Sequence, residues 1–220
     1  MLLYETVKGG VPSVIKRERI LNMKKFTAVF LTAALMFLFA GCSAKVVIPE
    51  EVLQLPEHSE VYTACNLWYN DGEKADNAAE IDELNIMKGK ILPFGTRIEF
   101  LPSDENGIAF KTVNGNKIFR FRYEQARNVE PVETVIRKFF TTKTPEELAS
   151  GIRPLDLEKI RRGLVEKGMR RKEVLLGYGN PPPLRTPVLN VDTWTYFVDF
   201  GVTKRVIFFD DRVIDIIQLD

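Results

Sequence analysis

The segment from Met23 to Cys42 constrains the fold most, because it sets the point at which folding can begin. It starts with Met-Lys-Lys, continues as an apolar run from Phe26 to Phe39, and ends with Ala-Gly directly before Cys42. A basic start, an apolar stretch and small residues in that order predict an export signal. The apolar run has about 14 residues, fewer than the roughly 20 that a membrane-spanning helix needs. We therefore expect the folded part of the chain to begin after Cys42.

The four residues Phe39–Cys42, FAGC, resemble the lipobox of bacterial lipoproteins. This resemblance implies that Cys42 is diacylated and becomes the amino terminus after cleavage. Two or more acyl chains give stable membrane anchoring, whereas one chain binds reversibly. The same resemblance implies that Ser43 in the next position, rather than Asp, favours the outer membrane and its periplasmic face, with an inner or single membrane as the alternative. A basic cluster at 16–19 precedes the complete signal, so we expect translation to start at Met23, leaving residues 1–41 as leader and signal.

The cysteine content agrees with a chain that relies on packing. With Cys42 modified, Cys65 is the remaining cysteine, so no intrachain disulfide is expected. A buried thiol is the favoured interpretation of Cys65, over a reactive one.

The composition, 45% hydrophobic and 28% charged, is that of a globular protein. From Cys42 onward 25 Lys and Arg face 28 Asp and Glu, and no basic stripe occurs, which argues against nucleic acid as a partner.

The residue types also argue against catalysis. The single histidine, His58, lies between Pro56 and Glu60 in a segment that has no packing pattern. A histidine-dependent triad or a multi-histidine metal site is therefore not expected. The acidic pair Asp210-Asp211 suits a turn, and Glu146-Glu147 suits a helix start. We predict a non-catalytic protein with no metal and no cofactor apart from the covalent lipid on Cys42.

Residues 42–60 are predicted to be a lipidated tether, followed by a β module over 61–125. Strands are expected at 61–69 and 97–101, and again at 108–113 and 117–123 on either side of Asn114-Gly115. That dipeptide is a strong signal for a tight hairpin. The module resembles small Src-homology-3-like barrels, which often bind peptides or wall glycans. Tyr62, Trp68 and Tyr69 are interpreted first as core residues and, alternatively, as a wall-binding surface.

Residues 126–155 change to helical spacing and are predicted to form a helical connector. Pro131 suits the first helical position, and Val132, Val135, Ile136, Phe139 and Phe140 form an apolar stripe. Thr144 and Glu147 have the spacing of a capping box at the start of a second helix.

Residues 156–220 are predicted to form an α+β domain. A helix over 156–167 should end at Gly168, and a second helix should end at Gly179. Strands are expected at 192–200, 205–209 and 213–218, with a tight turn at Asp210-Asp211. The simplest arrangement is a helix pair packed on a three-stranded antiparallel sheet. The expected fold class of the whole protein is therefore α+β, with a small β-barrel-like module, a helical connector and this domain.

Several residues of that last region carry a family resemblance. Gly168-Met169, Val174, Gly179-Asn180-Pro181 and the Trp194-x-Tyr196 strand resemble the SmpA/OmlA (BamE-like) family of outer-membrane lipoproteins, over about residues 156–218. The resemblance implies a small accessory subunit in outer-membrane β-barrel protein assembly, or an envelope stabiliser. Arg170 departs from the usual Thr or Ser, so the start of the second helix should be weaker or capped in another way. About 110 residues separate Cys42 from this region, which implies a different docking geometry.

Two functions follow as hypotheses. In the first, the protein is a non-catalytic, membrane-anchored factor that binds an envelope protein complex through its last domain. The expected contact residues are Pro181, Pro182, Pro183, Leu184 and the exposed parts of the strand with Trp194 and Tyr196, because consecutive prolines lower the entropy lost on binding. In the alternative, the β module binds peptidoglycan or a wall peptide through Tyr62, Trp68 and Tyr69.

Overall fold

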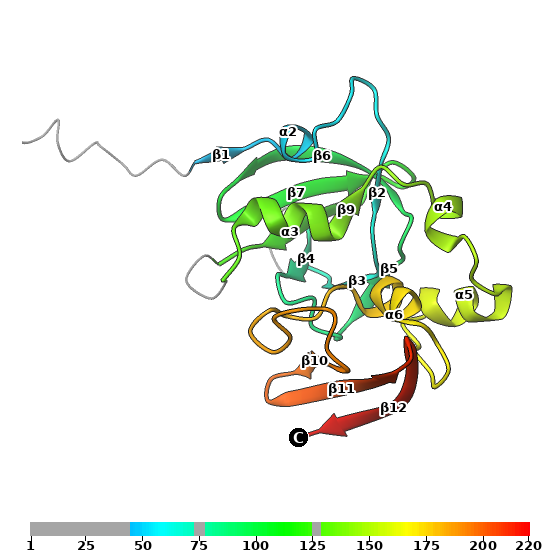
Figure 1. Ribbon diagram of the computed structural model, residues 1–220. Helices are drawn as coiled ribbons and strands as arrows, with labels where there is room; N and C mark the ends of the chain where they lie inside the picture. Colours follow the sequence, from blue (N-terminus) through cyan, green and yellow to red (C-terminus); the bar gives the residue numbers. More distant parts are fainter. Residues whose placement is uncertain (1–44, 73–77, 125–128) are drawn as a thin grey trace, which may run out of the picture. The chain divides into compact units, whose positions relative to one another are not determined.

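The computed structural model describes residues 45–72, 78–124 and 129–220 (Figure 1). The leader and Cys42 lie outside the described residues. The described elements are β1 Val46–Val47, α2 Pro49–Val52, β2 Val61–Thr63, β3 Leu67–Asn70, β4 Ala79–Asp82, β5 Lys90–Leu92, β6 Arg97–Asp104, β7 Gly107–Thr112, β8 Ile118–Arg122, α3 Val132–Phe139, β9 Phe140–Thr141, α4 Pro145–Ala149, α5 Pro154–Arg161, α6 Arg171–Tyr178, β10 Thr193–Asp199, β11 Val202–Phe209 and β12 Arg212–Leu219.

A curled nine-stranded sheet dominates the first two thirds of the described chain (Figure 1). Its strand order is β5-β3-β4-β8-β7-β6-β2-β9, and β1 pairs with β6. The pairs are antiparallel except β4 with β8, which run parallel. Helix α3 contributes Val135, Ile136 and Phe139 to the hydrophobic core of this sheet. The core therefore depends on contacts between segments that are distant in sequence.

Aromatic rings fill the interior of the curled sheet. Phe110 and Phe119 stack with ring centroids 5.2 Å apart, and Phe140 meets Phe110 edge-on at 5.2 Å. Along β7, buried and half-buried side chains alternate, as expected for a strand with one face in the core. Offset and edge-to-face ring pairs add to the stabilisation that burial alone provides.

The predicted hairpin around Asn114-Gly115 is present as β7 and β8, which pair antiparallel. A two-residue turn at Asn114-Gly115 would have positive φ angles at those two residues, but the observed positive φ angles are one position later. The positive φ angles fall on Gly115, at 103°, and on Asn116, at 51°. The strands close with the amide of Thr112 donating to the carbonyl of Lys117 at 3.0 Å, which leaves a four-residue loop.

The segment predicted as a tether contains packed structure from residue 46 onward. Val46 pairs with Asp104 and Val47 with Ser103. Val47 is buried in the sheet core, and Val52, Leu53 and Leu55 pack against that core. The sequence signal for a tether was polarity and proline content. Those features reflect the exposed faces of β1 and α2, so residues 46–55 belong to the folded body.

The helices are shorter than their sequence patterns predict. Pro131 is the N-cap of α3 rather than its first helical residue, and Phe140 already belongs to β9. The capping box of α4 is confirmed, with Glu147 N–H donating to the Thr144 hydroxyl at 3.2 Å and Thr144 N–H donating to the Glu147 carboxylate at 2.8 Å. Helix α5 stops at Arg161, because the chain turns at Gly163, where φ is 70°. The glycine that ends α5 is therefore Gly163, five positions before the predicted Gly168.

A second, three-stranded antiparallel sheet has the order β10-β11-β12. Trp194, Val206 and Ile216 are aligned across the three strands on the face that meets the second hydrophobic core. The turn between β11 and β12 has positive φ at both Asp210, 46°, and Asp211, 63°. Two consecutive residues with positive φ are typical of the type I′ turn that suits a two-residue hairpin.

The expected α+β class is wrong, because the protein is mostly β. The described helices have four to eight residues each, and the largest element is the nine-stranded sheet. The predicted arrangement of the last domain, a separate helix pair packed on the three-stranded sheet, is also wrong. The core that holds α5 and α6 also includes Met87, Phe94, Leu148 and Ile152 from earlier segments. The helical spacing in the sequence correctly indicated short helices, because it depends on neighbouring residues. The pairing of β4 with β8 joins distant segments and leaves no such pattern in the sequence.

Candidate binding surfaces

Asn66 lies at the junction between the strands of the large sheet and helices α5 and α6. Its side-chain amide donates to the carbonyls of Ile160, at 2.6 Å, and Gly177, at 3.1 Å. Its side-chain carbonyl accepts from the N–H of Phe94 at 2.9 Å. Asn66 is fully buried, so these bonds satisfy a side chain that would otherwise be costly to desolvate. The junction is therefore held by polar contacts among buried groups.

Asn85 makes a second set of buried contacts beside Asn66. Its amide donates to the carbonyls of Asn66, at 3.0 Å, and Tyr178, at 3.1 Å. Its side-chain carbonyl accepts from the N–H of Trp68 at 2.9 Å. Asn85 has a φ of 48°, a left-handed conformation that asparagine adopts more readily than most residues. These contacts fix the carboxyl end of α6, and hence the start of the loop that follows it.

The Cys65 thiol and the Tyr196 ring lie in the same buried region. Cys65 is 2% exposed, and burial raises the pKa of its thiol to about 12. The Tyr196 hydroxyl donates to the carbonyl of Gly179 at 3.1 Å, and burial raises the Tyr196 pKa well above its ordinary value. The thiol is thus neutral and inaccessible, which confirms the interpretation of Cys65 as a buried residue.

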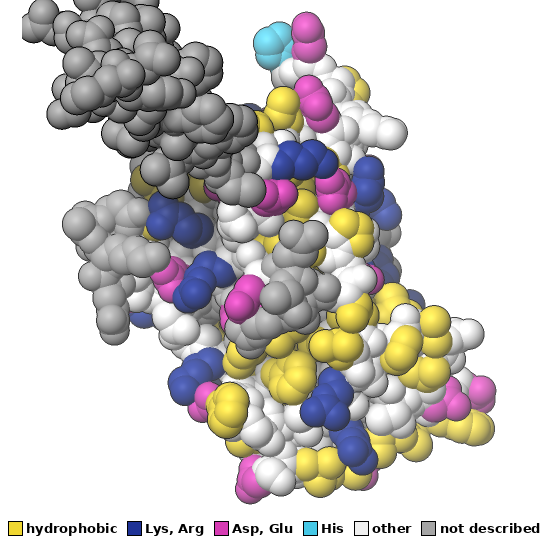
Figure 2. Space-filling model, turned by 90° about the vertical axis from the view of Figure 1, so that its left-hand side faces the viewer, with side chains coloured by type: hydrophobic (Ala, Val, Ile, Leu, Met, Phe, Trp, Pro, Cys, Tyr) yellow, Lys and Arg dark blue, Asp and Glu magenta, His cyan; other side chains and the backbone are white. Residues whose placement is uncertain are grey.

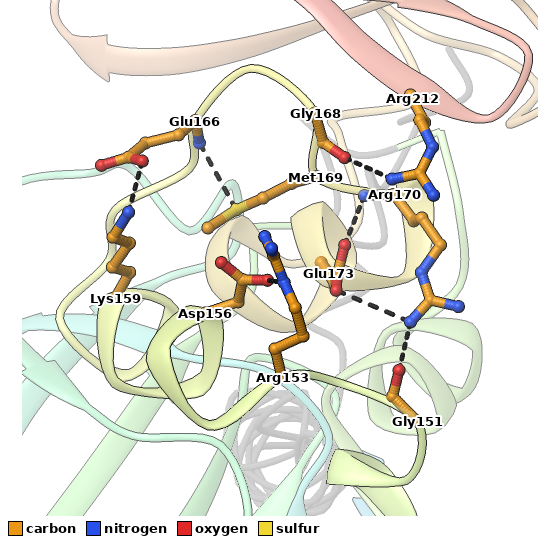
Figure 3. A network of polar contacts seen from close by, with 10 residues as sticks. All are labelled: Gly151, Arg153, Asp156, Lys159, Glu166, Gly168, Met169, Arg170, Glu173 and Arg212. Atoms are coloured by element: carbon orange, nitrogen blue, oxygen red, sulfur yellow. Dashed lines mark hydrogen bonds and ion pairs between the residues drawn. The ribbon is translucent and has the colours of Figure 1, made fainter.

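The Gly168-Met169 motif sits in a network of polar contacts (Figure 3). The Arg212 guanidinium donates to the carbonyl of Gly168 at 2.8 Å. The amide of Gly168 donates to the carbonyl of Val213 at 2.7 Å, and the amide of Val213 donates to the carbonyl of Met169 at 2.8 Å. The motif therefore attaches the start of β12 to the segment that leads into α6.

Helix α6 has Arg170 as its N-cap, without a side-chain hydroxyl that could accept from its first-turn amides. The buried Glu173 carboxylate accepts from the backbone N–H of Arg170, and the Arg170 guanidinium donates to the carbonyl of Gly151 (Figure 3). Glu173 also lies 3.6 Å from the Arg170 guanidinium. An acidic side chain in the first turn interacts favourably with the helix dipole. Glu173 thus makes its half of a capping box, whereas the Arg170 side chain, which only donates, does not accept from the first-turn amides as Thr or Ser would.

Residues 180–192, here called the proline loop, connect α6 to β10 on the left of Figure 1. The amides of Arg185 and Thr186 both donate to the carbonyl of Pro182 at 2.9 Å. The Thr186 hydroxyl, which is buried, accepts from the N–H of Thr195 at 3.0 Å. The loop has no helix or strand of its own, yet its backbone is fixed at several points.

The Arg171 side chain binds the second half of the proline loop, residues 189–192. One guanidinium nitrogen donates to the carbonyls of Leu189, at 2.9 Å, and Val191, at 2.6 Å, and the other donates to the Asp192 carboxylate at 3.1 Å. The same guanidinium lies 4.3 Å from the centroid of the Phe208 ring. The planar fork of arginine suits several acceptors at once and also stacks on aromatic faces. The indole N–H of Trp194 adds a further bond, 3.2 Å to the carbonyl of Leu189.

The structure separates the six predicted partner-binding residues into two groups. Trp194 is 1% exposed and Tyr196 is 3% exposed, so their side chains support the loop from the core. Pro181 and Pro182 are also buried, Pro183 is half-buried, and Leu184 is 63% exposed. Leu184 and part of Pro183 are therefore accessible for contact, whereas the two aromatic side chains are not.

Sequence reasoning missed three exposed aliphatic residues of the proline loop. Val188, Leu189 and Val191 are 53%, 41% and 38% exposed. Figure 2 shows hydrophobic side chains gathered over the lower half of the face that it presents. The run PVLNV at 187–191 was a usable signal, because apolar residues without helical or strand periodicity, next to prolines, have no obvious place in a core.

The three residues of the alternative surface occupy different environments. Tyr62 is buried, whereas Trp68 and Tyr69 are half-buried. Trp68 packs beside Gly163, and Tyr69 meets Phe119 edge-on with ring centroids 5.1 Å apart. Lys117 lies 4.3 Å from the centroid of the Tyr69 ring. These contacts agree with the first interpretation, in which the three residues serve packing.

Among the described residues, no group of three or more His, Cys, Asp or Glu side chains could hold a metal ion. Within the same parts of the chain, no helix is long and apolar enough to cross a membrane. Comparisons with protein families, with curated proteins and with solved structures return no match.

Proposed function

We propose that the protein is a lipid-anchored, non-catalytic accessory factor that binds an envelope protein complex through the proline loop. The observation that carries the proposal is the combination of exposed aliphatic side chains with a fixed backbone. Leu184, Val188, Leu189 and Val191 are 38% to 63% exposed. Their backbone is held by Arg171, Trp194 and the turn at Pro182.

A fixed apolar loop is suited to binding another protein. Ordering a flexible loop on association costs free energy, and a loop that is already ordered avoids much of that cost. Aliphatic residues that leave water on binding contribute roughly 25 cal/mol for each Å² of apolar surface removed. The loop therefore has both the apolar surface and the rigidity of a docking element.

The anchoring part of the proposal rests on the sequence from Met23 to Cys42. An export signal that ends at a lipobox-like cysteine supports a mature chain that begins at Cys42 and carries acyl chains. The family resemblance at Gly168–Pro181 and Trp194 supports outer-membrane β-barrel protein assembly, or envelope integrity, as the process involved. Peptidoglycan binding remains the competing hypothesis in the test.

Site-specific photocrosslinking in the intact envelope tests this proposal. A photoreactive residue at Val188 should crosslink to a subunit of the barrel-assembly machinery, identified by mass spectrometry. Leu184→Asp should reduce the crosslink several-fold, because it places a charge in the apolar contact. Leu155→Asp on α5 is the matched control, since Leu155 and Leu184 are both 63% exposed.

Two outcomes would contradict the proposal. Sedimentation with purified wall sacculi, without crosslinks to assembly subunits, would favour peptidoglycan binding. Equal crosslinking in the Leu184→Asp and Leu155→Asp variants would show that the proline loop is not the contact surface.

A further inference from the structure

The described part of the chain begins at an edge of the large sheet. The carbonyl of Lys45 accepts from the amide of Glu105 at 2.9 Å, and Val46 pairs with Asp104. This edge lies where β6 turns into β7. In Figure 1, β1 lies at the opposite end of the body from β11 and β12.

Only a short stretch of chain separates this edge from the proposed lipid. Cys42 precedes Lys45 by three positions, and three residues span at most about 11 Å when fully extended. A tether that reached residue 60 would have allowed about 60 Å by the same rule. Because β1 is paired to β6, the short reach limits how far the folded body can move from the membrane surface.

The side chains nearest to that attachment point are unusual for a solvent-facing strand. Val46 is 72% exposed and Ile48 is 46% exposed, whereas Val47 between them is 6% exposed. Alternate residues of an extended chain point to opposite sides, so Val46 and Ile48 share the outward side. The outward side of the first paired residues is therefore aliphatic.

Charged groups of both signs lie beside these aliphatic residues. Lys45 and Val47 line a surface hollow together with Glu105, Pro131 and Glu133. The Lys45 ammonium lies 3.9 Å from the Glu133 carboxylate, and the Lys45 side chain is 72% exposed. A lysine beside carboxylates complements a headgroup that carries a phosphate and an ammonium. The two carboxylates would repel a surface that is purely anionic.

We propose that Lys45, Val46 and Ile48, here called the β1 face, rest against the zwitterionic phospholipid headgroups of the membrane that holds the Cys42 lipid. This inference rests on the proposed lipid anchoring. It adds an orientation, in which the end of the body that carries β1 faces the membrane and the end that carries β11 and β12 projects away from it. The anchor and the β1 face together would hold the protein upright on the surface.

Fluorescence quenching from the lipid headgroups tests the orientation. The lipoprotein is purified from membranes with a single label at Val46→Cys or at Phe200→Cys, a position that is 99% exposed in the hairpin between β10 and β11. Cys65 is buried and should not react with the label. The samples are reconstituted in vesicles of phosphatidylethanolamine and phosphatidylcholine that contain headgroup-spin-labelled phosphatidylcholine. The label at position 46 should be quenched several-fold more strongly than the label at position 200.

A spacer variant tests whether the short connection to Cys42 sets the orientation, and a mass measurement separates this inference from the proposed function. A flexible Gly-Ser segment inserted between Ser43 and Ala44 should lower the quenching at position 46 towards the level at position 200. The mass of each purified protein is measured first. A chain without acyl groups would overturn both the anchoring and the orientation. An acylated chain with equal quenching at the two positions would overturn the orientation alone.

Discussion

The side-chain amide of Asn66, next to β3, donates a hydrogen bond of 2.6 Å to the carbonyl of Ile160 in α5, 94 residues further along the chain. Ile160 is fully buried in the second core, while Leu67 beside Asn66 is fully buried in the first. One polar side chain thus links the two hydrophobic cores. Its removal should affect the whole described body rather than one element.

Asn66→Ala should lower the free energy of unfolding by about 3 kcal/mol, because it leaves the Phe94 amide and two carbonyls buried without their partner. Urea unfolding of the purified protein measures the change. Asn114→Ala is the matched control, since Asn114 is exposed in the β7–β8 loop and should change stability by less than about 0.5 kcal/mol. Equal losses in the two variants would show that the junction does not depend on Asn66.

Gly163→Ala should destabilise the protein more than Gly151→Ala. Both glycines have a left-handed φ, 70° and 72°, so both substitutions strain the backbone by about 1 kcal/mol. A methyl group at position 163 would also lie 2.7 Å from Trp68, whereas nothing lies within 4 Å at position 151. Overpacking adds about 1 to 3 kcal/mol at Gly163. Similar unfolding midpoints for the two variants would contradict the close packing of Trp68 on Gly163.

Arg171→Lys should loosen the proline loop without unfolding the protein. Lysine cannot reproduce the forked contacts with Leu189, Val191 and Asp192, and each lost bond of this kind contributes about 1 kcal/mol. Amide hydrogen exchange should become faster at Thr186 and at residues 188–192. Arg162→Lys, at an exposed position after α5, should leave that exchange unchanged. Unaltered loop exchange in Arg171→Lys would remove the argument that the loop is fixed in advance.

Stability should decline at alkaline pH because of Cys65. Burial raises the pKa of its thiol to about 12 from an ordinary value near 9. The unfolded chain releases this proton at lower pH than the folded chain, so the contribution is complete below about pH 9 and is lost progressively up to about pH 12. In that window the wild type should lose about 1.4 kcal/mol more per pH unit than Cys65→Ala. Thermal unfolding of both proteins from pH 7 to 10.5 measures the difference, and parallel curves would contradict it.

Local signals in the sequence predicted local structure well. Asn114-Gly115 indicated a hairpin, Thr144 with Glu147 indicated a capped helix, and Asp210-Asp211 indicated a turn, because each depends on neighbouring residues only. The sheet order could not be read in this way. Parallel pairing of β4 with β8 brings together segments about 40 residues apart, and their alternation carries no information about the partner strand.

In the candidate site, too, features that depend on neighbouring residues could be predicted and contacts between distant residues could not. The prolines and Leu184 drew attention to the correct segment, because consecutive prolines mark an extended connection. Trp194 and Tyr196 were expected to be partly accessible, yet they alternate with Thr195 on β10 and point into the second core. The role of Arg171 had no sequence signal, since two of its three acceptors are backbone carbonyls that any residue could supply.

The intact mass of the protein extracted from its native membrane tests the central claim most directly. We predict a chain that begins at Cys42 and carries a diacylglyceryl group. A Cys42→Ser variant should retain the uncleaved leader and carry no lipid. A wild-type chain that begins at Met1 or Met23, or one that begins after the signal without any acyl group, would contradict the account.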